Sequence, residues 1–534
     1  MTKRALISVF DKTGIVPLAK ALQECSWEII STGGTLKVLE KEGIVVSDIS
    51  RVTKNPEVFG GRVKTLSFQI SSAILFDREK DLDEAKALEI EPIDFVVCNC
   101  YPFEQVYKRG AEISQLVENI DIGGPTMIRS AAKNFMNVSV LTDPKDYPSI
   151  CEELKSSSGR LCLKTRKKLM RKAFNYVADY DACIAMAMDK EEEIHSLRLS
   201  FSEGRSLRYG ENSHQKAFFF RERQAEHSLY DMKLLQGKQL SYNNLMDINS
   251  AVDGVKDLKR SGCAIIKHNT PCGLSESETS ASALSLAWRA DPISSFGSVI
   301  AFNRSLNEKD IDFFQFSNPD KGKRKFIEAI VAPGFSPKIL ESLSTQKSLR
   351  LVEYQSSFKE NIEKEFRYFK GSLLLQDTDS KLFERLSCVT IEKIKIDEEF
   401  VEFGLKAVKQ VKSNAIAVVR KLEDGSFQLL GMGAGQPNRL ISVSLAIDKC
   451  RQNLIDEFDG VSEERECYVQ RELGKSLLIS EAFFPFRDSV DFCARHGIKA
   501  ILQPGGSIRD KEVIQACDDH KVAMVLTGLR HFKH

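Results

Sequence analysis

The first 150 residues repeat one pattern, in which a short β-rich run leads through a loop of Gly, Ser, Thr or Asp into a helical segment. The clearest runs are residues 5–9 (ALISV), 27–31 (WEIIS) and 93–98 (IDFVVC). Alternation of this kind predicts a parallel sheet with helices on its faces, and it gathers the loops that follow the strands at one edge, where ligands bind. Further apolar runs joined to helical segments follow beyond residue 205. We therefore expect an α/β protein throughout.

The length of the chain, 534 residues, exceeds the usual size of one domain and predicts about two to four units. A long charged helical stretch covers residues 144–195 and ends in the sequence DKEEEIHS. We place the domain boundary here, with a first domain at 1–195 and a second at 196–534. The second domain is large enough for two subdomains and would fit a duplicated α/β unit, although no repeat of identical residues is visible.

Charge and composition argue against several classes of protein. The 76 Lys and Arg residues nearly balance the 75 Asp and Glu residues, so the charge gives no indication of a nucleic-acid or membrane partner. We recognise neither a signal peptide nor a membrane span, because no apolar run approaches about 18 residues. The 13 cysteines form no CxxC pair, which favours reduced thiols and a cytoplasmic protein.

Three loops of the first domain carry groups suited to an anion. The stretch TGGT follows the run WEIIS and opens a helix, so its amides and hydroxyls would point at a bound phosphate. The candidates are Ser8 and Lys12 from the first run and its loop, Thr32, Gly34 and Thr35 from TGGT, and Arg62, Lys64 and Thr65 from GGRVKT. Loops of Gly, Ser and Thr are often simple turns, so the residues alone leave a phosphate site and a purely structural role open.

The first 194 residues contain no histidine, so proton transfer in the first domain must use Lys, Tyr, Asp, Glu, Cys, backbone or water. Two stretches, NCYPF at 99–103 and IDIGGPTMIRSAAKN at 120–134, carry candidate groups. In the second stretch Lys133 follows Asp121 by twelve residues, several turns away if one helix runs throughout. Lys133 taken alone fits a surface lysine as well as a catalytic one.

In the second domain, CAIIKHNTPCG places Lys267 and His268 side by side after an apolar run. We expect a strand that ends at these two residues and a chain that turns away at Pro271 and Gly273. An ammonium beside the imidazole disfavours a second positive charge, so His268 would stay neutral and able to act as a base. The alternative is a loop with one surface lysine and one hydrogen-bonded histidine.

Two cofactor classes fit this domain poorly. A zinc deaminase needs H-x-E followed by P-C-x-x-C. Here Asn269 and Thr270 follow His268, and Gly273-Leu274-Ser275 follows Cys272, so the ligands are missing and we expect no metal. The stretch GMGAGQ departs from GxGxxG because Gln436 replaces the last glycine, which argues against a dinucleotide site.

A series of short motifs extends the evidence to the whole chain. In order they are SVFDKTG, STGGT, GGRVKTL, NCYPF, IDIGGPT, RSAAKN, LRYGENSHQ, KHNTPCG, SSFG, KSNAI, GAGQPNR, EAFFPFRD and LRHFKH. In this order they resemble the bifunctional purine biosynthesis enzymes, which join phosphoribosylaminoimidazolecarboxamide (AICAR) formyltransferase to IMP cyclohydrolase. The resemblance covers the chain from Ala5 to His534.

For the first domain the resemblance implies a methylglyoxal-synthase-like fold and a cyclohydrolase that closes the formylated nucleotide (FAICAR) to IMP. The residues that would bind the nucleotide are Ser8, Lys12, Thr32, Gly34, Thr35, Arg62, Lys64, Thr65 and Asn99. Those that would surround the reacting formamide are Lys64, Tyr101, Asp121 and Lys133, with Lys133 as the proton-transfer group. Ser67 and Phe68 stand where the family usually has His-Pro, a departure that bears on the shape of this loop.

For the second domain the resemblance implies a formyltransferase built from two cytidine-deaminase-like subdomains without a metal, with 10-formyltetrahydrofolate as cosubstrate. His268 would be the general base, Lys267 would stabilise the oxyanion, and Asn414 would contact the carboxamide. The residues that would bind nucleotide or folate are Arg208, Tyr209, Phe296, Gly297, Glu328, Arg439, Phe483, Ser507, Ile508 and Arg530. The family also implies a homodimer.

Two other hypotheses stay open at this point. In the first, residues 1–195 are a phosphate-sensing regulatory module with the same fold, and only the second domain is catalytic. In the second, the chain is a metal-dependent deaminase, which the missing ligands disfavour. Turnover of the folate, IMP formation and zinc content would distinguish the three.

Overall fold

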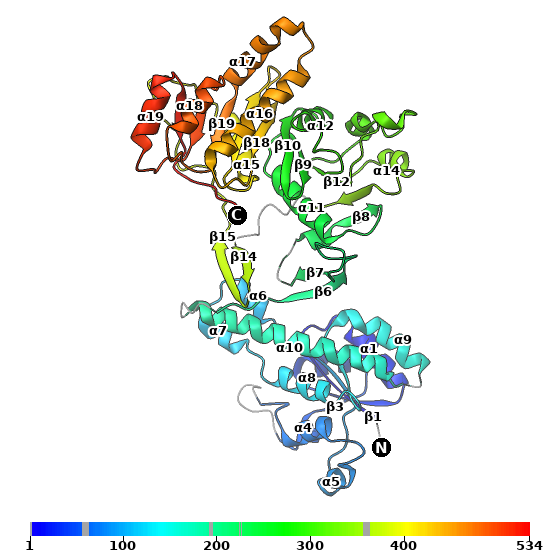
Figure 1. Ribbon diagram of the computed structural model, residues 1–534. Coiled ribbons are helices and arrows are strands. Elements are labelled where there is room, and N and C mark those ends of the chain that lie inside the picture. Colours follow the sequence, from blue (N-terminus) through cyan, green and yellow to red (C-terminus); the bar gives the residue numbers. More distant parts are fainter. Residues whose placement is uncertain are drawn as a thin grey trace. The chain divides into compact units, whose positions relative to one another are not determined.

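The structure is a computed structural model that describes residues 3–55, 63–157, 159–191, 196–223, 225, 227–355 and 364–534. The chain forms two compact units, Met1–Ser200 and Phe201–His534 (Figure 1). Among the helices of the described residues, none combines the length and apolarity that a membrane span requires.

The first unit contains a five-stranded, fully parallel sheet in the order β3-β2-β1-β4-β5. The strands are β1 (Lys3–Val9), β2 (Trp27–Ser31), β3 (Val46–Asp48), β4 (Phe95–Asn99) and β5 (Ser139–Leu141). The helices are α1 (Ile15–Glu24), α2 (Gly33–Lys41), α3 (Ser50–Thr53), α4 (Phe68–Leu75), α5 (Leu82–Ala87), α6 (Phe103–Lys108), α7 (Ile113–Glu118), α8 (Gly123–Lys133), α9 (Tyr147–Ser156) and α10 (Leu163–Glu191). The predicted parallel α/β sheet is confirmed.

Burial on both faces explains the apolar runs of this sheet. Ala5, Leu6 and Ile7 of β1 are all fully buried, because helices cover both sides of a central parallel strand. Helix α1 buries Ile15, Leu18 and Leu22, a spacing that forms one stripe on a helix. The five strands run in the same direction, so their carboxyl ends all open onto one edge.

The second unit is organised around a twelve-stranded sheet in the order β16-β21-β20-β19-β17-β18-β10-β9-β11-β12-β13-β8. Its strands are β8 (Lys233–Gln236), β9 (Ser261–Lys267), β10 (Thr270–Ser277), β11 (Val299–Phe302), β12 (Ala329–Ala332), β13 (Arg350–Glu353), β16 (Ser387–Cys388), β17 (Ile416–Lys421), β18 (Phe427–Gly433), β19 (Leu477–Ser480), β20 (Ala500–Gln503) and β21 (Ala523–Leu526). The helices are α11 (Tyr242–Val255), α12 (Ser280–Arg289), α13 (Glu308–Ile311), α14 (Pro337–Leu343), α15 (Glu398–Lys409), α16 (Arg439–Glu457), α17 (Arg465–Lys475), α18 (Asp488–Arg495) and α19 (Asp510–Asp519). Two separate ribbons pair β6 (Phe201–Ser206) with β7 (Phe218–Glu222) and β14 (Lys364–Phe369) with β15 (Ser372–Asp377).

The two halves of this sheet repeat one arrangement. Outward from the centre, β10-β9-β11-β12-β13-β8 on one side matches β18-β17-β19-β20-β21-β16 on the other. Each half has an antiparallel hairpin at the centre, parallel strands beyond it and an antiparallel edge strand. The strand order therefore supports a duplicated α/β unit, which no identical residues revealed. The deaminase-like character of each half stays a prediction.

Alternate residues of the central strands enter different cores. In β9, Ala264 and Ile266 join a cluster that includes residues of α11 and α15, whereas Cys263 and Ile265 join a cluster that includes residues of α12 and α14. Successive side chains of a strand point to opposite faces, so a strand covered on both faces needs an uninterrupted apolar run. This explains why CAII contains no polar residue.

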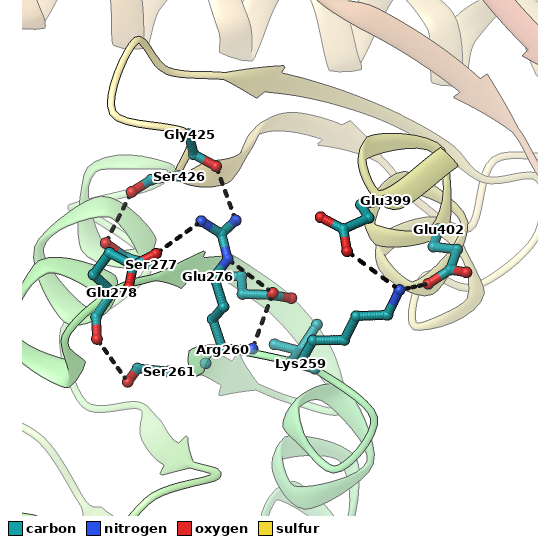
Figure 2. A network of polar contacts seen from close by, with 12 residues as sticks. Lys259, Arg260, Ser261, Glu276, Ser277, Glu278, Glu399, Glu402, Gly425 and Ser426 are labelled. Carbon is teal, nitrogen blue, oxygen red and sulfur yellow. Dashed lines mark hydrogen bonds and ion pairs between the residues drawn. The ribbon is translucent and has the colours of Figure 1, made fainter. Parts of the chain in front are cut away.

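The halves meet where β10 pairs antiparallel with β18 through Ser275 and Glu276. Figure 2 shows the polar network at this junction. Arg260 donates to the carbonyl oxygen of Gly425 at 2.8 Å and pairs with Glu276 at 3.2 Å. The hydroxyls of Ser277 and Ser426, one from each half, lie 2.8 Å apart.

Candidate active sites

Two lysines converge on the loop that opens α2 in the first unit. A methyl group built on Gly33 would lie 3.3 Å from Nζ of Lys64, and one built on Gly34 would lie 3.8 Å from Nζ of Lys12. Gly33 has a φ of 52°, a conformation that glycine adopts without strain. The first amides of a helix attract anions, and two ammonium groups beside them add positive charge. This arrangement suits a phosphate group.

Two predicted binding residues hold the loop after β1. The side-chain oxygen of Asn99 accepts the amides of Phe10 and Asp11 at 2.7 and 2.9 Å, and its amide nitrogen donates to the carbonyl of Asp11 at 3.0 Å. Thr35 is bonded in both directions to the backbone of Val9. These contacts give Asn99 and Thr35 a role in shaping the site.

A cavity of about 230 Å³ lies beside Lys64. Its lining residues include Thr32, Lys64 and Ser67. Ser67, the residue that departs from the family pattern, caps α4 by accepting the amide of Ile70 at 3.1 Å. Ser67 therefore both caps α4 and lines the cavity. Arg62 lies outside the described residues.

Asp121 stands at the start of α8, next to two other predicted residues. Its carboxylate accepts the amide of Gly124 at 2.7 Å and a further backbone hydrogen bond from Tyr101. Burial raises the pKa of Asp121, and these hydrogen bonds partly offset that effect. The hydroxyl of Thr65 packs against Gly123, where an added methyl group would lie 2.5 Å away. Lys64, Thr65, Tyr101 and Asp121 thus belong to loops that meet.

Lys133 lies at the opposite end of α8 from Asp121. It is the last residue of α8, is exposed, and is separated from Gly123 by ten residues of helix. At 1.5 Å per residue the two ends of α8 are about 15 Å apart. The role of Lys133 beside Asp121 therefore stays a prediction. Ser8, in β1, has its position at the same sheet edge as the other loops.

The twelve-stranded sheet gathers the predicted residues of the second unit at one edge. Lys267 at the end of β9 pairs with Thr270 at the start of β10, and Ile416 at the start of β17 pairs with Gly433 at the end of β18. Because β10 and β18 are antiparallel, these two pairs lie at the same edge of the sheet. The loops at this edge carry His268, Phe296, Gly297, Glu328, Asn414, Arg439, Phe483, Ser507, Ile508 and Arg530. Two strands, β10 and β18, lie between β9 and β17 in the sheet order. The sheet therefore faces Lys267 and Asn414 toward a common edge.

The hairpin at Lys267 corrects the expected path of the chain. The turn is formed by His268 and Asn269, with φ of 54° and 57°, and Thr270–Ser277 returns as the neighbouring strand β10. The prediction of a turn at Pro271 and Gly273 is wrong. Gly273 instead lets α12 approach, because a methyl group there would lie 1.9 Å from the carbonyl oxygen of Ala287.

The two basic residues of the hairpin have different surroundings. Lys267 donates from Nζ to the carbonyl oxygen of Phe296 at 2.8 Å, which ties it to the predicted loop that includes Gly297. His268 is exposed at the tip of the hairpin. The amide of Asn269 donates to Asp247 of α11 at 2.8 Å. Sequence reasoning missed Asp247, and its only signal was a carboxylate within the helical stretch before CAIIKHN.

Asn414 and Arg439 form a second group. Arg439 donates to the side-chain oxygen of Asn414 at 2.7 Å and pairs with the buried Glu481 at 2.5 Å. The amide nitrogen of Asn414 donates to the carbonyl oxygens of Gln436 and Pro437 at 2.7 and 3.0 Å. The donors of Asn414 are therefore engaged within the protein, and only its oxygen keeps a lone pair for a ligand. A contact of Asn414 with a carboxamide would therefore use its side-chain oxygen as the acceptor.

The remaining predicted residues have varied surroundings. Glu328 pairs with Arg350 at 2.5 Å. The amide of Ser507 donates to Asp510 at 3.2 Å, and Ile508 beside it is exposed. Phe483 is half-buried. Arg208 and Arg530 are exposed and stack on the rings of Tyr209 and Phe532, both at 4.9 Å.

Two further observations concern a metal ion and a dinucleotide as ligands. Within the part of the chain that the structure describes, no group of three His, Cys, Asp or Glu side chains could hold a metal ion. Two of the three glycines of GMGAGQ serve packing, because methyl groups on Gly431 and Gly433 would lie 2.5 and 2.0 Å from carbonyl oxygens of α16. The third, Gly435, has open space around it and a φ of 66°.

Comparison with known proteins connects these two units to one family. The family described as AICARFT/IMPCHase bienzyme matches residues 131–449, and the MGS-like domain matches residues 14–126. The bifunctional purine biosynthesis protein PurH of Persephonella marina is 42% identical over 548 residues, with 100% of both chains covered. The PurH proteins of Clostridium botulinum strain 657 and of Aquifex aeolicus are 43% and 41% identical, and the alignments cover 100% and 99% of this chain and 100% of each relative. A crystal structure of ForH, 35% identical, covers 35% of this chain and 96% of its own with a TM-score of 0.32. The chain belongs to the AICARFT/IMPCHase bienzyme family, with an MGS-like domain at its N-terminus.

Proposed function

We propose that this chain performs the last two steps of IMP synthesis at two separate sites. The formyl group of 10-formyltetrahydrofolate passes to AICAR in the second unit, and the product FAICAR closes to IMP in the first. The family match along both units and the full-length PurH relatives favour this function over a regulatory role for the first unit. The assignment of one activity to residues 1–195 and the other to 196–534 is our inference.

The observation that carries the formyltransferase assignment is the common edge of the twelve-stranded sheet. In this proposal the 5-amino group of AICAR attacks the formyl carbon, and His268 accepts the proton that the amine loses. The carbonyl oxygen becomes an oxyanion, which the ammonium of Lys267 stabilises. When the intermediate collapses, N10 of the folate leaves with a proton as tetrahydrofolate. Fixed positive charge at the developing oxyanion supplies a large part of such a rate increase.

The ring closure needs less from the protein. The carboxamide nitrogen of FAICAR attacks its own formyl carbon, and the resulting hydroxyl departs as water. Because both groups belong to one molecule, binding in a near-attack shape provides much of the acceleration. Lys12, Lys64 and the first turn of α2 would hold the phosphate, and the group around Asp121 would assist the loss of water.

Several finer features belong to the same proposal. The ribbon β14–β15 exposes Tyr368, Phe369 and Leu374, of which Tyr368 is 75% exposed, and an isolated ribbon of this kind is marginal alone. Exposed apolar surface commonly marks an interface, so we infer a homodimer. All thirteen cysteines are free thiols, which fits a cytoplasmic protein. The sheet-edge residues Phe296, Glu328, Phe483, Ser507, Ile508 and Arg530, together with Arg208 and Tyr209, would bind nucleotide and folate.

The decisive experiment supplies AICAR and 10-formyltetrahydrofolate to the purified protein and follows folate turnover and IMP formation together. We expect both. Absence of folate turnover would contradict the formyltransferase, whereas turnover with accumulation of FAICAR would restore the regulatory alternative. His268→Ala should lower formyl transfer by about 10²-fold while closure of supplied FAICAR continues. Equal loss of both activities would contradict two separate sites.

A further inference from the structure

Asp247 of α11 lies against the hairpin turn that presents His268. Its carboxylate accepts the amide of Asn269 at 2.8 Å, and the backbone of His268 also contributes a hydrogen bond to it. One turn along the same helix, the hydroxyl of Ser250 donates to the side-chain oxygen of Asn269 at 3.1 Å. Residues three apart share one face of a helix, so Asp247 and Ser250 together hold both residues of the turn.

This turn needs support because of its backbone conformation. His268 and Asn269 have φ of 54° and 57°, in the left-handed region that costs a residue with a side chain about 1 kcal/mol or more. Two-residue hairpins with two positive φ values usually contain glycine, and this one contains none. The hydrogen bonds to Asp247 therefore stabilise a conformation that the sequence of the turn does not favour by itself.

Charge gives Asp247 a second effect on the base. Burial raises the pKa of Asp247, while the two turn amides and the charge of His268 act in the opposite direction, so the carboxylate and the imidazole interact. Lys267, the residue before His268, places a positive charge next to it in the chain. The other ionisable groups near the hairpin are Cys272, whose pKa burial raises to about 12, and the Asp291–Lys449 pair at 2.7 Å. Asp247, which accepts the turn amides, and Lys267, which precedes His268, thus place opposite charges beside the turn.

We propose that Asp247 is a positioning residue for formyl transfer, which fixes the His268–Asn269 turn and opposes the charge of Lys267 so that His268 can both accept and release a proton. The inference deepens the proposed formyltransferase and rests on His268 being its base. Asp247 does not need to touch the substrate. It acts through the backbone and the electrostatic environment of the hairpin.

The test compares two substitutions at this position with a matched control. Asp247→Asn keeps an oxygen acceptor for the turn but removes the charge, whereas Asp247→Ala removes both. Asp253→Asn serves as the control, because Asp253 lies on the same helix, is similarly part-buried, and pairs with Lys256 at 2.8 Å. For each variant we would measure kcat/KM of formyl transfer from pH 5 to 9, closure of supplied FAICAR and the temperature of unfolding.

We expect Asp247→Asn to move the acid limb of the formyl-transfer profile about 0.5 to 1 pH unit lower, because loss of a nearby carboxylate lets the imidazolium release its proton more easily. Asp247→Ala should lower kcat/KM about 10-fold or more at every pH, with ring closure unchanged. Asp253→Asn should match the parent profile. The proposal is overturned if the Asp247→Asn profile superimposes on the parent, or if Asp247→Ala reduces both activities equally.

His268→Ala in the same assay separates this inference from the proposed function. If His268→Ala retains formyl transfer, the base assignment itself fails, and the role of Asp247 fails with it. If His268→Ala loses formyl transfer but the two Asp247 variants behave like the control, the formyltransferase stands and only the role of Asp247 is refuted.

Discussion

Arg439 joins Asn414 to a fully buried carboxylate. Its guanidinium donates to Asn414 at 2.7 Å and pairs with Glu481, which is 0% exposed, at 2.5 Å. The charge of Arg439 is thus neutralised within the protein, where water cannot reach its partner. Arg439 therefore orients Asn414 at the sheet edge, and we expect its contribution to substrate binding to act through Asn414.

Removing this guanidinium should destabilise the second unit strongly. In Arg439→Met the carboxylate of Glu481 would be buried without a partner, which costs about 3–5 kcal/mol. The double variant Arg439→Met with Glu481→Met should recover much of this loss in urea unfolding, because no charge then stays buried. Arg471→Met offers a control, since Arg471 is exposed, pairs with its neighbour Glu472 and stacks on the ring of Tyr468. Equal stability of the single and double variants would contradict the buried-pair argument.

The two glycines of the α2 loop should respond differently to alanine. Gly33 has a φ of 52°, and a methyl group added to it would lie 3.3 Å from Nζ of Lys64. Gly34 has an ordinary φ, and a methyl group added to it would lie 3.7 Å from the nearest atom of Lys12. Gly33→Ala should cost about 1–2 kcal/mol of stability and raise KM for FAICAR. Gly34→Ala should be neutral or slightly stabilising. Both variants would be measured by steady-state ring closure and by thermal unfolding. A larger loss in Gly34→Ala than in Gly33→Ala would show that the loop adopts another conformation when ligand is bound.

The strands and loops of the first unit show which parts of the fold could be predicted from the sequence. The runs ALISV, WEIIS and IDFVVC predicted parallel strands because burial on both faces leaves a strong local signal, and the structure confirms β1, β2 and β4. The loops after these strands were found for the same reason, since parallel strands bring their carboxyl ends to one edge. The local sequence pattern was therefore sufficient to predict those features that follow from burial and strand direction.

The hairpin at Lys267 shows where local pattern failed. Pro271 and Gly273 are typical turn residues, yet the chain turns at His268 and Asn269, because Asp247 and Ser250 of α11 stabilise that turn from a distance in the sequence. Pro271 sits beside a bulge in β10, where the ladder of hydrogen bonds is interrupted. Contacts between segments far apart in the chain, such as Arg439 with Glu481, were equally beyond a reading of local motifs.

Ring closure should depend more on Asp121 than on Lys133. Asp121 accepts hydrogen bonds from the backbone of Gly124, in the first turn of α8, and of Tyr101, which follows β4. Lys133 lies at the other end of α8, about 15 Å along the helix. We expect Asp121→Asn to reduce closure of supplied FAICAR by about 10²-fold. Lys133→Ala should have the smaller effect. Both variants should retain formyl transfer, and a Lys133→Ala enzyme with the greater loss would restore the proton-transfer role that the family resemblance implies.

Acid should loosen the C-terminal segment that carries Arg530. His531 is buried and places one ring nitrogen 2.7 Å from Asp379 and the other 2.8 Å from the carbonyl oxygen of Leu382. Burial raises the pKa of Asp379, but the hydrogen bond from His531 and the charge of Lys409 outweigh it, so the pKa is lowered overall. A carboxyl with a lowered folded-state pKa adds stability above its unfolded value, about 3.9, and loses it as the pH falls through the folded value.

Asp379→Asn should therefore flatten the acid side of the stability profile. Unfolding temperatures of parent and variant should differ at pH 7 and converge below about pH 4. Parallel curves across this range would show that the pair contributes nothing that depends on protonation of Asp379.

Lys259 and Arg260, adjacent residues of the junction in Figure 2, should contribute very differently to the free energy of unfolding. Arg260 donates to Gly425 at 2.8 Å, pairs with the buried Glu276 at 3.2 Å and stacks on Phe427 at 4.8 Å, so it joins the two halves of the sheet. In Arg260→Met, Glu276 keeps only the backbone amide of residue 260, and we expect a loss of about 2–4 kcal/mol in urea unfolding. Lys259→Met breaks pairs with Glu399 and Glu402, which are open to solvent to different extents, and should cost less than about 1 kcal/mol.

The activity of the same variants tests whether the junction sets the spacing of the site. Lys267 and Asn414 belong to different halves, which the pairing of β10 with β18 joins through Ser275 and Glu276. A junction weakened by Arg260→Met should therefore lower formyl transfer at temperatures where the protein is still folded, while FAICAR closure in the first unit continues. Lys259→Met should leave both activities unchanged. If Arg260→Met lowers stability but not formyl transfer, the β10–β18 ladder alone maintains the distance between the two halves.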